Sequence, residues 1–180
     1  MYPVETINYL LSLATIAMQI AAAALFALYF LRRKFTDLED NAKLIGEWGL
    51  WLGFLLSAGG IVLSLFYSEV LGFAPCGLCW LQRVFLFPQA VLFAVALWKK
   101  DARVADYSIA LSVLGAVVAL YQHYIQMGGA DVLPCPATAG EAVDCAVRFL
   151  FEFGYITFPL MSFSLFAFLA VVMLFVRARR

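Results

Sequence analysis

The sequence predicts an all-α polytopic membrane protein: a four-helix transmembrane bundle plus one additional N-terminal transmembrane helix. Two observations predict this fold class. Of the 180 residues, 65% are hydrophobic and 13% are charged, and the mean hydropathy is +0.93, whereas soluble domains are about 45–50% apolar and about 25% charged. Five apolar runs also reach the roughly 20 residues that a helix needs to cross the hydrocarbon core. The apolar excess excludes a soluble enzyme and a disordered chain, and the balance of 12 basic and 12 acidic residues excludes a nucleic-acid-binding protein.

The predicted spans are residues 7–31, 48–68, 80–98, 106–126 and 155–176. Each run is continuous rather than alternating and is too long for a strand, which predicts helices. The first run is interpreted as a retained span rather than a signal peptide. It is long for a signal peptide, has Glu5 at its start and is followed by Arg32-Arg33-Lys34.

Charge asymmetry predicts how the spans are oriented. Ten of the 12 Lys and Arg residues follow span one, three or five, all on one side of a five-span topology. The positive-inside rule makes this side cytoplasmic, so the N-terminus is predicted outside and the C-terminus inside. The predicted parts are an extra N-terminal transmembrane helix (1–34), a cytoplasmic linker (35–46) and a four-helix bundle (47–180) with extracytoplasmic loops at 69–79 and 127–154. The linker fits either an interfacial helix or a polar connector, because apolar and acidic residues alternate along it.

All four cysteines fall on the predicted extracytoplasmic side, where disulfides persist. Cys76 and Cys79 lie between spans two and three, and Cys135 and Cys145 lie between spans four and five. The Cys-x-x-Cys spacing at a predicted helix start favours a redox-active disulfide, because a helix N-terminus stabilises a thiolate. The alternatives are an inert disulfide and a zinc site that uses all four thiols; no metal is expected. The second pair alone would be a loop staple, but beside another cysteine pair, thiol–disulfide exchange is the better interpretation.

Arg83 and His123 are the candidate cofactor-binding residues. Arg83 follows Cys79 by four positions and Cys76 by seven, so it shares their helix face just inside the apolar region. A charge at that depth is costly and suggests a function; alternatively it extends to the interface or pairs with Glu69. His123, the only histidine, is expected at similar depth, where it either assists the cofactor or is an ordinary hydrogen-bonded polar residue. Weaker candidates for polar neighbours of the same pocket are Gln82, Gln89 and Gln126.

Together these residues suggest a route for two electrons. The thiols can pass electrons between the two loops, and an acceptor must then take them. The sequence shows no haem-attachment motif, dinucleotide fingerprint or iron–sulfur spacing. A lipid-soluble quinone is therefore the predicted cofactor, with Arg83 stabilising the charge that develops on its oxygen atoms. The substrate on the other side is predicted to be a thiol carrier in the extracytoplasmic space.

Three segments carry a resemblance to a known family. They are Pro75-Cys76-Gly77-Leu78-Cys79-Trp80-Leu81-Gln82-Arg83 followed by Phe87-Pro88, and two weaker ones, Tyr121-Gln122-His123 and Phe153-Gly154-Tyr155-Ile156-Thr157-Phe158-Pro159. Over about residues 45–176 the sequence resembles the DsbB family of disulfide bond formation proteins, especially its short-loop branch. The resemblance implies an enzyme of the bacterial cytoplasmic (inner) membrane. This enzyme would reoxidise a DsbA-like thioredoxin-fold thiol oxidase and pass the electrons to ubiquinone or menaquinone.

The resemblance also implies a role for each candidate residue. Cys79 would face the quinone, and Cys76 would exchange with Cys145. Cys135 would form the mixed disulfide with the thiol oxidase. Arg83 would bind the quinone, with His123 assisting.

Two alternative functions remain open at this point. A vitamin K epoxide reductase-like quinone reductase shares the helical bundle and both cysteine pairs, but there the loop pair precedes the Cys-x-x-Cys pair. The other alternative is a non-enzymatic membrane scaffold that is stapled by disulfides or binds a metal. The sequence also departs from the DsbB pattern, because the first span lies outside the usual four-helix core and only nine residues separate Cys135 from Cys145.

Overall fold

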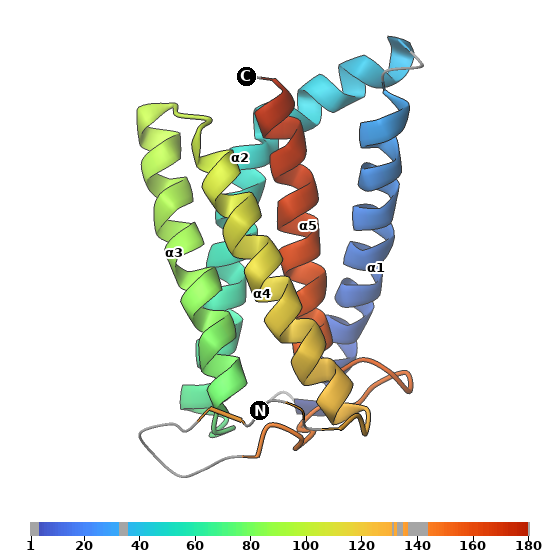
Figure 1. Ribbon diagram of the computed structural model, residues 1–180, viewed down its shortest axis with the longest axis vertical. Helices are drawn as coiled ribbons and strands as arrows, with labels where there is room; N and C mark the ends of the chain where they lie inside the picture. The colour runs from blue at the N-terminus through green and yellow to red at the C-terminus, as the bar shows by residue number, and fades with distance from the viewer. Residues whose placement is uncertain (1–3, 33–35, 131, 133–134, 137–143, 180) are drawn as a thin grey trace.

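The computed structural model of the protein describes residues 4–32, 36–130, 132, 135–136 and 144–179 (Figure 1). Its elements are α1 (Val4–Leu31), α2 (Thr36–Leu65), a π-helix η1 (Phe66–Val70), α3 (Gly77–Lys99), α4 (Val104–Gln126) and α5 (Phe158–Ala178). Five helices, with η1 continuing α2, are long and apolar enough to span a membrane. The described residues contain no strand, only one isolated β-bridge. The predicted all-α polytopic fold is confirmed.

Four of the helices close into a bundle, and α1 packs outside it. Neighbouring contacts join α2 to α3, α3 to α4, α4 to α5 and α5 back to α2. α1 packs mainly against α5 and makes only limited contact with α2. Figure 1 shows α1 at the edge of the molecule, beside α5. The structure therefore separates a four-helix core from one peripheral helix, as the sequence predicted.

The residues predicted as a linker are helical from Thr36 onward and continue without a break into the second span. Figure 1 shows these first turns of α2 crossing the end of the bundle before the helix turns down into it. Ala42 is buried against Val171 and Phe175 of α5. Of the two alternatives for this segment, the structure supports the helix.

Large aromatic side chains fill the middle of the bundle, and small residues make room for them. Phe93 of α3 and Phe166 of α5 are almost completely buried. Gly53 of α2 faces the ring of Phe93, where a β-carbon would lie 2.9 Å from the nearest ring atom. The hydroxyl of Ser57 is satisfied by the carbonyl of Gly53, 2.7 Å away. Small residues in α2 therefore allow close helix packing here.

Both cysteine-bearing segments lie at the same end of the bundle. α1 begins at this end, and α5 finishes at the opposite end, together with the start of α2 and the α3–α4 connection (Figure 1). The basic residues Arg32, Lys99 and Arg177 occur where helices reach that opposite end. This arrangement brings the four cysteines together, although they are widely separated in sequence.

Candidate functional site

Cys76 and Cys79 form a pair of free thiols at the start of α3. Cys76 is the N-cap residue, in an extended conformation, and Cys79 lies in the first helical turn. Their Sγ atoms are 3.1 Å apart. Cys76 is 3% exposed, whereas Cys79 is partly exposed and borders a cavity inside the bundle. The pair therefore spans the boundary between the outer segments and the helical interior; we call it the inner pair.

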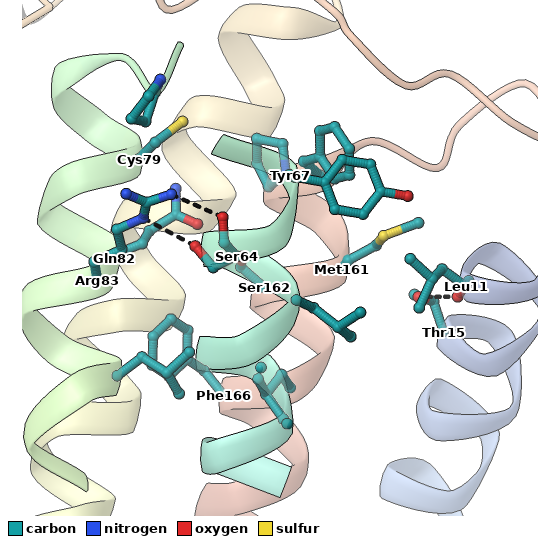
Figure 2. A pocket seen from close by; sticks show the side chains of 18 of the residues that line it. Leu11, Thr15, Ser64, Tyr67, Cys79, Gln82, Arg83, Met161, Ser162 and Phe166 are labelled. Carbon is teal, nitrogen blue, oxygen red and sulfur yellow. Dashed lines mark hydrogen bonds between the residues drawn. The ribbon is translucent and has the colours of Figure 1, made fainter. Parts of the chain in front are cut away.

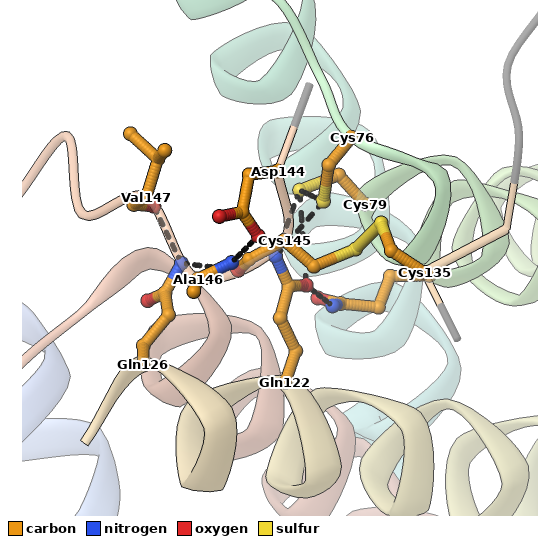
Figure 3. The surroundings of a disulfide bond; sticks show 10 residues. Cys76, Cys79, Gln122, Gln126, Cys135, Asp144, Cys145, Ala146 and Val147 are labelled. Carbon is orange, nitrogen blue, oxygen red and sulfur yellow. Dashed lines mark hydrogen bonds between the residues drawn. A yellow bond between two sulfur atoms is a disulfide. The ribbon is translucent and has the colours of Figure 1, made fainter. Parts of the chain in front are cut away.

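Cys135 and Cys145 are joined in a disulfide that rests on the inner pair (Figure 3). The Sγ atoms of Cys76, Cys135 and Cys145 all lie within 4.8 Å of one another. Cys145 is 2% exposed and packs in one apolar cluster with Cys76. Exchange requires that a sulfur atom reach the disulfide, and the structure brings Cys76 to this position. The zinc alternative would need this disulfide to be reduced, because it calls for four free thiolates.

Gly77 allows the segment that contains Cys135 and Pro136, which we call the outer segment, to approach the inner pair this closely. The carbonyl group of Pro136, next to Cys135, lies directly against Gly77, in the space where a β-carbon would be. Gly77 is not among the described glycines with a positive φ, so its backbone conformation would accept other residues. The glycine in the Cys-x-x-Cys motif is therefore needed for the contact with the outer segment and not for the helix start.

Gln126 fixes the other side of the disulfide (Figure 3). Its Nε2 atom donates to the carbonyl of Val147 at 2.9 Å and to that of Cys145 at 3.4 Å. Asp144 accepts a hydrogen bond from the backbone N–H of Ala146 at 2.9 Å, which shapes the turn around Cys145. These bonds tie the disulfide to the end of α4, which itself packs against α3.

Gln122 of α4 contacts both thiols of the inner pair. Its Nε2 atom donates to Cys76 Sγ at 3.1 Å and to Cys79 Sγ at 3.2 Å. Gln82 Nε2 donates to Gln122 Oε1 at 2.6 Å, which fixes the orientation of the Gln122 amide. Both glutamines are buried. Amide N–H donors aimed at sulfur stabilise negative charge there, and such bonds are stronger when the acceptor is charged.

The two cysteines of the inner pair lie in different environments. Cys76 lies outside the membrane-spanning segments, and the hydrogen bond with Cys79, together with burial, raises the pKa of the Cys76 thiol above its ordinary value. The raised pKa lowers the thiolate fraction of Cys76 in the reduced pair. Because the thiolate is the nucleophile, attack of Cys76 on the neighbouring disulfide is slowed.

Arg83 is buried one helical turn below Cys79, as its position in the sequence predicted. It is 7% exposed. Its Nε donates to Ser64 Oγ, and its Nη2 donates to the Ser64 carbonyl and to Ser68 Oγ, each at 2.9 Å. No ion pair with Glu69 is found among the described residues. The Nη1 atom is buried and has no hydrogen-bond partner in the described part of the chain.

A cavity of about 360 Å³ opens beside Cys79 and Arg83. Figure 2 shows the two side chains on the same side of α3, facing the space bounded by α2, α5 and α1. Other polar residues that line the cavity include Gln82, Gln122, Ser64 and Ser68. Most of the remaining lining residues are apolar. An apolar pocket with a few converging polar groups is the usual form of a small-molecule site. The charged and amide groups of this pocket lie at the sulfur end.

The structure does not bring His123 to this cavity. His123 Nδ1 lies 2.8 Å from Oγ1 of Thr157, the N-cap residue of α5, and His123 is not among the residues that line the cavity. The adjacent Gln122 points at the sulfurs instead. Gln89, a weaker candidate, lies deeper in the bundle, where its Oε1 accepts from the hydroxyls of Ser108 and Ser112.

A pattern in span four identifies the face that Gln122 occupies. Small and polar residues recur there at intervals of three or four, which is the spacing of one helix face. These residues are buried in α4: Ser108, Ser112, Gly115, Ala119, Gln122 and Gln126. His123 lies off this face, so helical periodicity favours Gln122 over His123 as the residue that points inward.

These features define a class: a polytopic membrane protein with two adjoining cysteine pairs, built for thiol–disulfide exchange. Comparison with known proteins identifies the family. The family model for disulfide bond formation protein DsbB matches residues 46–176, and the chain belongs to the DsbB family. It is thus a disulfide-generating, multi-pass bacterial membrane protein, and the resemblance found in the sequence is confirmed.

Curated relatives agree with this assignment. The SPbeta prophage-derived disulfide bond formation protein B of Bacillus subtilis is 39% identical over 127 residues, which are 71% of this chain and 83% of the relative. The probable disulfide formation protein C of Bacillus cereus is 34% identical over 133 residues, covering 74% and 90%. The probable disulfide formation protein of Metapseudomonas resinovorans is 36% identical over 132 residues, covering 72% and 86%. No solved structure matches the chain.

Proposed function

We propose that the protein reoxidises a DsbA-like thioredoxin-fold thiol oxidase and passes the electrons to a quinone in the bacterial cytoplasmic membrane. In the proposed orientation, the N-terminus and both cysteine segments face outward and the C-terminus faces the cytoplasm. The grouping of the cysteines at one end of the bundle and of the basic helix ends at the other supports this orientation.

One observation carries the proposal. Cys76 Sγ lies within 4.8 Å of both sulfurs of the outer disulfide, while Cys79, 3.1 Å from Cys76, borders the cavity that contains Arg83. The four sulfur atoms therefore form a continuous path from the outer segment to a pocket within the membrane-spanning bundle. A disulfide that merely stapled the loop would not need this path.

The electrons balance at each exchange. The dithiol of the thiol oxidase becomes a disulfide as Cys135–Cys145 is reduced to two thiols. These thiols then reduce a Cys76–Cys79 disulfide and restore the outer disulfide. The inner pair now holds the two electrons, and the raised pKa of Cys76 disfavours the return attack on Cys135–Cys145.

The exposure of the outer cysteines supports separate roles for them. Cys145 is 2% exposed and packs with Cys76, whereas Cys135 is only partly buried. A thiol arriving from the aqueous side can approach Cys135 more readily than Cys145. Cys135 is therefore assigned to the mixed disulfide with the thiol oxidase, and Cys145 to exchange with Cys76.

The cavity residues fit a quinone. The buried Nη1 of Arg83 has an unused donor among the described residues, and a quinone oxygen is a matching acceptor. When bound, the quinone accepts two electrons and two protons from the inner pair. Arg83 would orient its oxygen, Gln122 would stabilise charge on the Cys76 and Cys79 sulfurs, and the apolar lining would exclude water. Both ubiquinone and menaquinone meet these requirements, and His123 has no assigned contact.

An anaerobic titration tests the proposal. Purified protein is mixed with a reduced DsbA-like partner and a defined quinone, and quinone reduction is followed by absorbance. We expect stoichiometric reduction by the wild-type protein, none with Cys79→Ser, and slow reduction by small thiols alone with Cys135→Ser. Partner oxidation by a protein in which all four cysteines are serine would overturn the assignment, as would intact disulfides after incubation of the wild-type protein with excess reduced partner.

A further inference from the structure

α1 lies outside the segment that matches the DsbB family, residues 46–176, and outside the ring of four helices. The cavity nevertheless extends to it: Leu11, Ala14, Thr15 and Met18 are among the lining residues. We infer that this face of α1 forms the wall that receives the prenyl tail of the quinone and makes the site selective for tailed quinones. The inference rests on the proposed function and adds a specificity determinant to it.

The cavity has a polar end and an apolar end. Its guanidinium, thiol and amide groups belong to α3 and α4, and Ser64 and Ser68 contact Arg83 on the same side. A third lining serine, Ser162, belongs to α5. On the α1 side, the only polar group among the four lining residues is the hydroxyl of Thr15, which already bonds to the carbonyl of Leu11 at 2.8 Å. Figure 2 shows Arg83 and Leu11 on opposite sides of the cavity. A ligand with a polar ring and an apolar tail fits this gradient.

Specific contacts hold α1 against the rest of the molecule, so the side of the cavity that α1 forms has a defined position. Asn8 Oδ1 accepts a hydrogen bond from the hydroxyl of Tyr67 at 2.5 Å. About three turns further along α1, Gln19 Nε2 donates to Ser164 Oγ of α5 at 2.9 Å. Ile16 packs on an apolar cluster at the start of α5, formed by Leu150, Ile156 and Leu160. A helix that served only as an anchor would not need polar contacts to both α5 and the end of α2.

The size of the cavity is consistent with a ring and the start of a tail. Its volume of about 360 Å³ lies near the lower limit of the roughly 300–1,000 Å³ that small-molecule sites occupy. The remainder of a long prenyl chain would continue into the lipid. The competing occupant of the apolar end is a lipid acyl chain, in which case α1 would have no influence on the choice of quinone.

The test compares two substitutions on adjacent turns of α1. Both alanines are exposed, but Ala14 lines the cavity and Ala17 does not. Ala14→Phe therefore places a ring at the apolar end of the cavity, and Ala17→Phe adds the same side chain outside it. Each protein is assayed in one detergent with quinones that share a ring and carry no, one or two isoprenoid units. We expect Ala14→Phe to raise KM for the tailed quinones about tenfold, the factor for losing about two buried methylene groups. KM for the tail-less quinone, and every KM of Ala17→Phe, should match the wild type.

A second variant keeps the test decisive if Ala14→Phe does not fold. Met18→Ala shortens a side chain in the same wall and so removes contacts with the tail. It should raise KM for tailed quinones several-fold and leave KM for the tail-less quinone unchanged. Equal dependence of KM on tail length in wild type, Ala14→Phe and Met18→Ala would overturn the inference and assign the space to lipid. Failure of the wild-type protein to reduce any quinone would instead overturn the proposed function, so the two failures are distinguishable.

Discussion

Gly77 lies against the carbonyl group of Pro136 so closely that a β-carbon at position 77 would overlap it. The two residues are neighbours of Cys76 and Cys135 in sequence. Their contact is therefore the point at which the outer segment packs against the start of α3. The approach of the two cysteine pairs depends on the absence of a side chain at this position.

We predict that Gly77→Ala slows electron transfer from the outer pair to the inner pair. Overpacking of such a contact costs about 1–3 kcal/mol, so the rate should fall by about tenfold or more. The measurement is a single-turnover reaction with a reduced thiol partner in the absence of quinone, followed by quantification of each disulfide by mass spectrometry.

Gly59→Ala is the matched control for this variant. A β-carbon at Gly59 would meet no atom within 4 Å, and although Gly59 lines the cavity, it takes no part in the thiol-only step. An unchanged transfer rate in Gly77→Ala would show that the outer disulfide reaches Cys76 without this contact.

Gln122 should accelerate exchange through its hydrogen bonds to both sulfurs. A hydrogen bond to a charged group contributes about 1.5–3 kcal/mol, so Gln122→Leu should slow formation and reduction of the Cys76–Cys79 disulfide by about tenfold to a hundredfold. Stopped-flow measurement of the exchange rate provides the readout.

Gln82 should act only through Gln122, since it fixes the orientation of that amide. Gln82→Leu is therefore expected to slow exchange less than Gln122→Leu does. The double variant should be no slower than Gln122→Leu alone, because coupled residues are not additive. Additive losses would mean that the two glutamines contribute independently.

Arg83 is expected to affect the quinone more than the thiols. Arg83→Ala should raise the KM for quinone about tenfold or more, while the quinone-free exchange between cysteine pairs should change much less. Arg148→Ala is the control, since Arg148 stacks on the ring of Phe151 at 4.8 Å and does not line the cavity. An unchanged KM for Arg83→Ala would leave Arg83 with only a structural role in binding Ser64 and Ser68.

Cys76 should react with alkylating reagents only at high pH when the inner pair is reduced. The pKa of Cys76 is raised, so the thiolate fraction, and with it the rate, should increase about tenfold per pH unit up to that raised value. The rate is measured by mass spectrometry in a protein in which Cys135 and Cys145 are serine.

Cys79→Ala in the same background removes the largest cause of the shift, the hydrogen bond between the two thiols. The pH at which Cys76 becomes reactive should then move downward, toward the ordinary thiol range. Identical pH profiles in the two proteins would contradict the assigned cause.

The spans and the placement of the cysteines could be predicted from sequence because they depend on local properties. Hydrophobic length fixes each span, and the positions of Cys76 and Cys79 relative to Arg83 follow from helical periodicity. The position of α1 outside the four-helix ring was also expected, although its contribution to the cavity was not. That contribution depends on how α1 packs on α5, which no pattern within a single helix reveals.

The residues around the sulfurs were harder to predict. Gln122 and His123 differ by one position, which is about 100° around a helix, so the rotation of α4 in the bundle decides which of them faces the thiols. The partners of Arg83 were also missed, because α2 ends in the π-helix Phe66–Val70. The wider π-turn changes the register locally, and Ser68 within it hydrogen-bonds to the guanidinium instead of Glu69. Ser64, one turn earlier in α2, is the other partner.

The junction between the two cysteine pairs is closed to water, since Cys76 is 3% exposed and Cys145 is 2% exposed. Small reductants in the surrounding medium therefore have no direct entry to it from the aqueous side. Of the two outer cysteines, only Cys135 is partly exposed, so it is the point at which a thiol from the aqueous side can approach the outer disulfide. In the proposed function, this burial would slow the direct oxidation of small thiols at Cys76 and Cys145, which would otherwise consume quinone without forming a disulfide in the thiol oxidase.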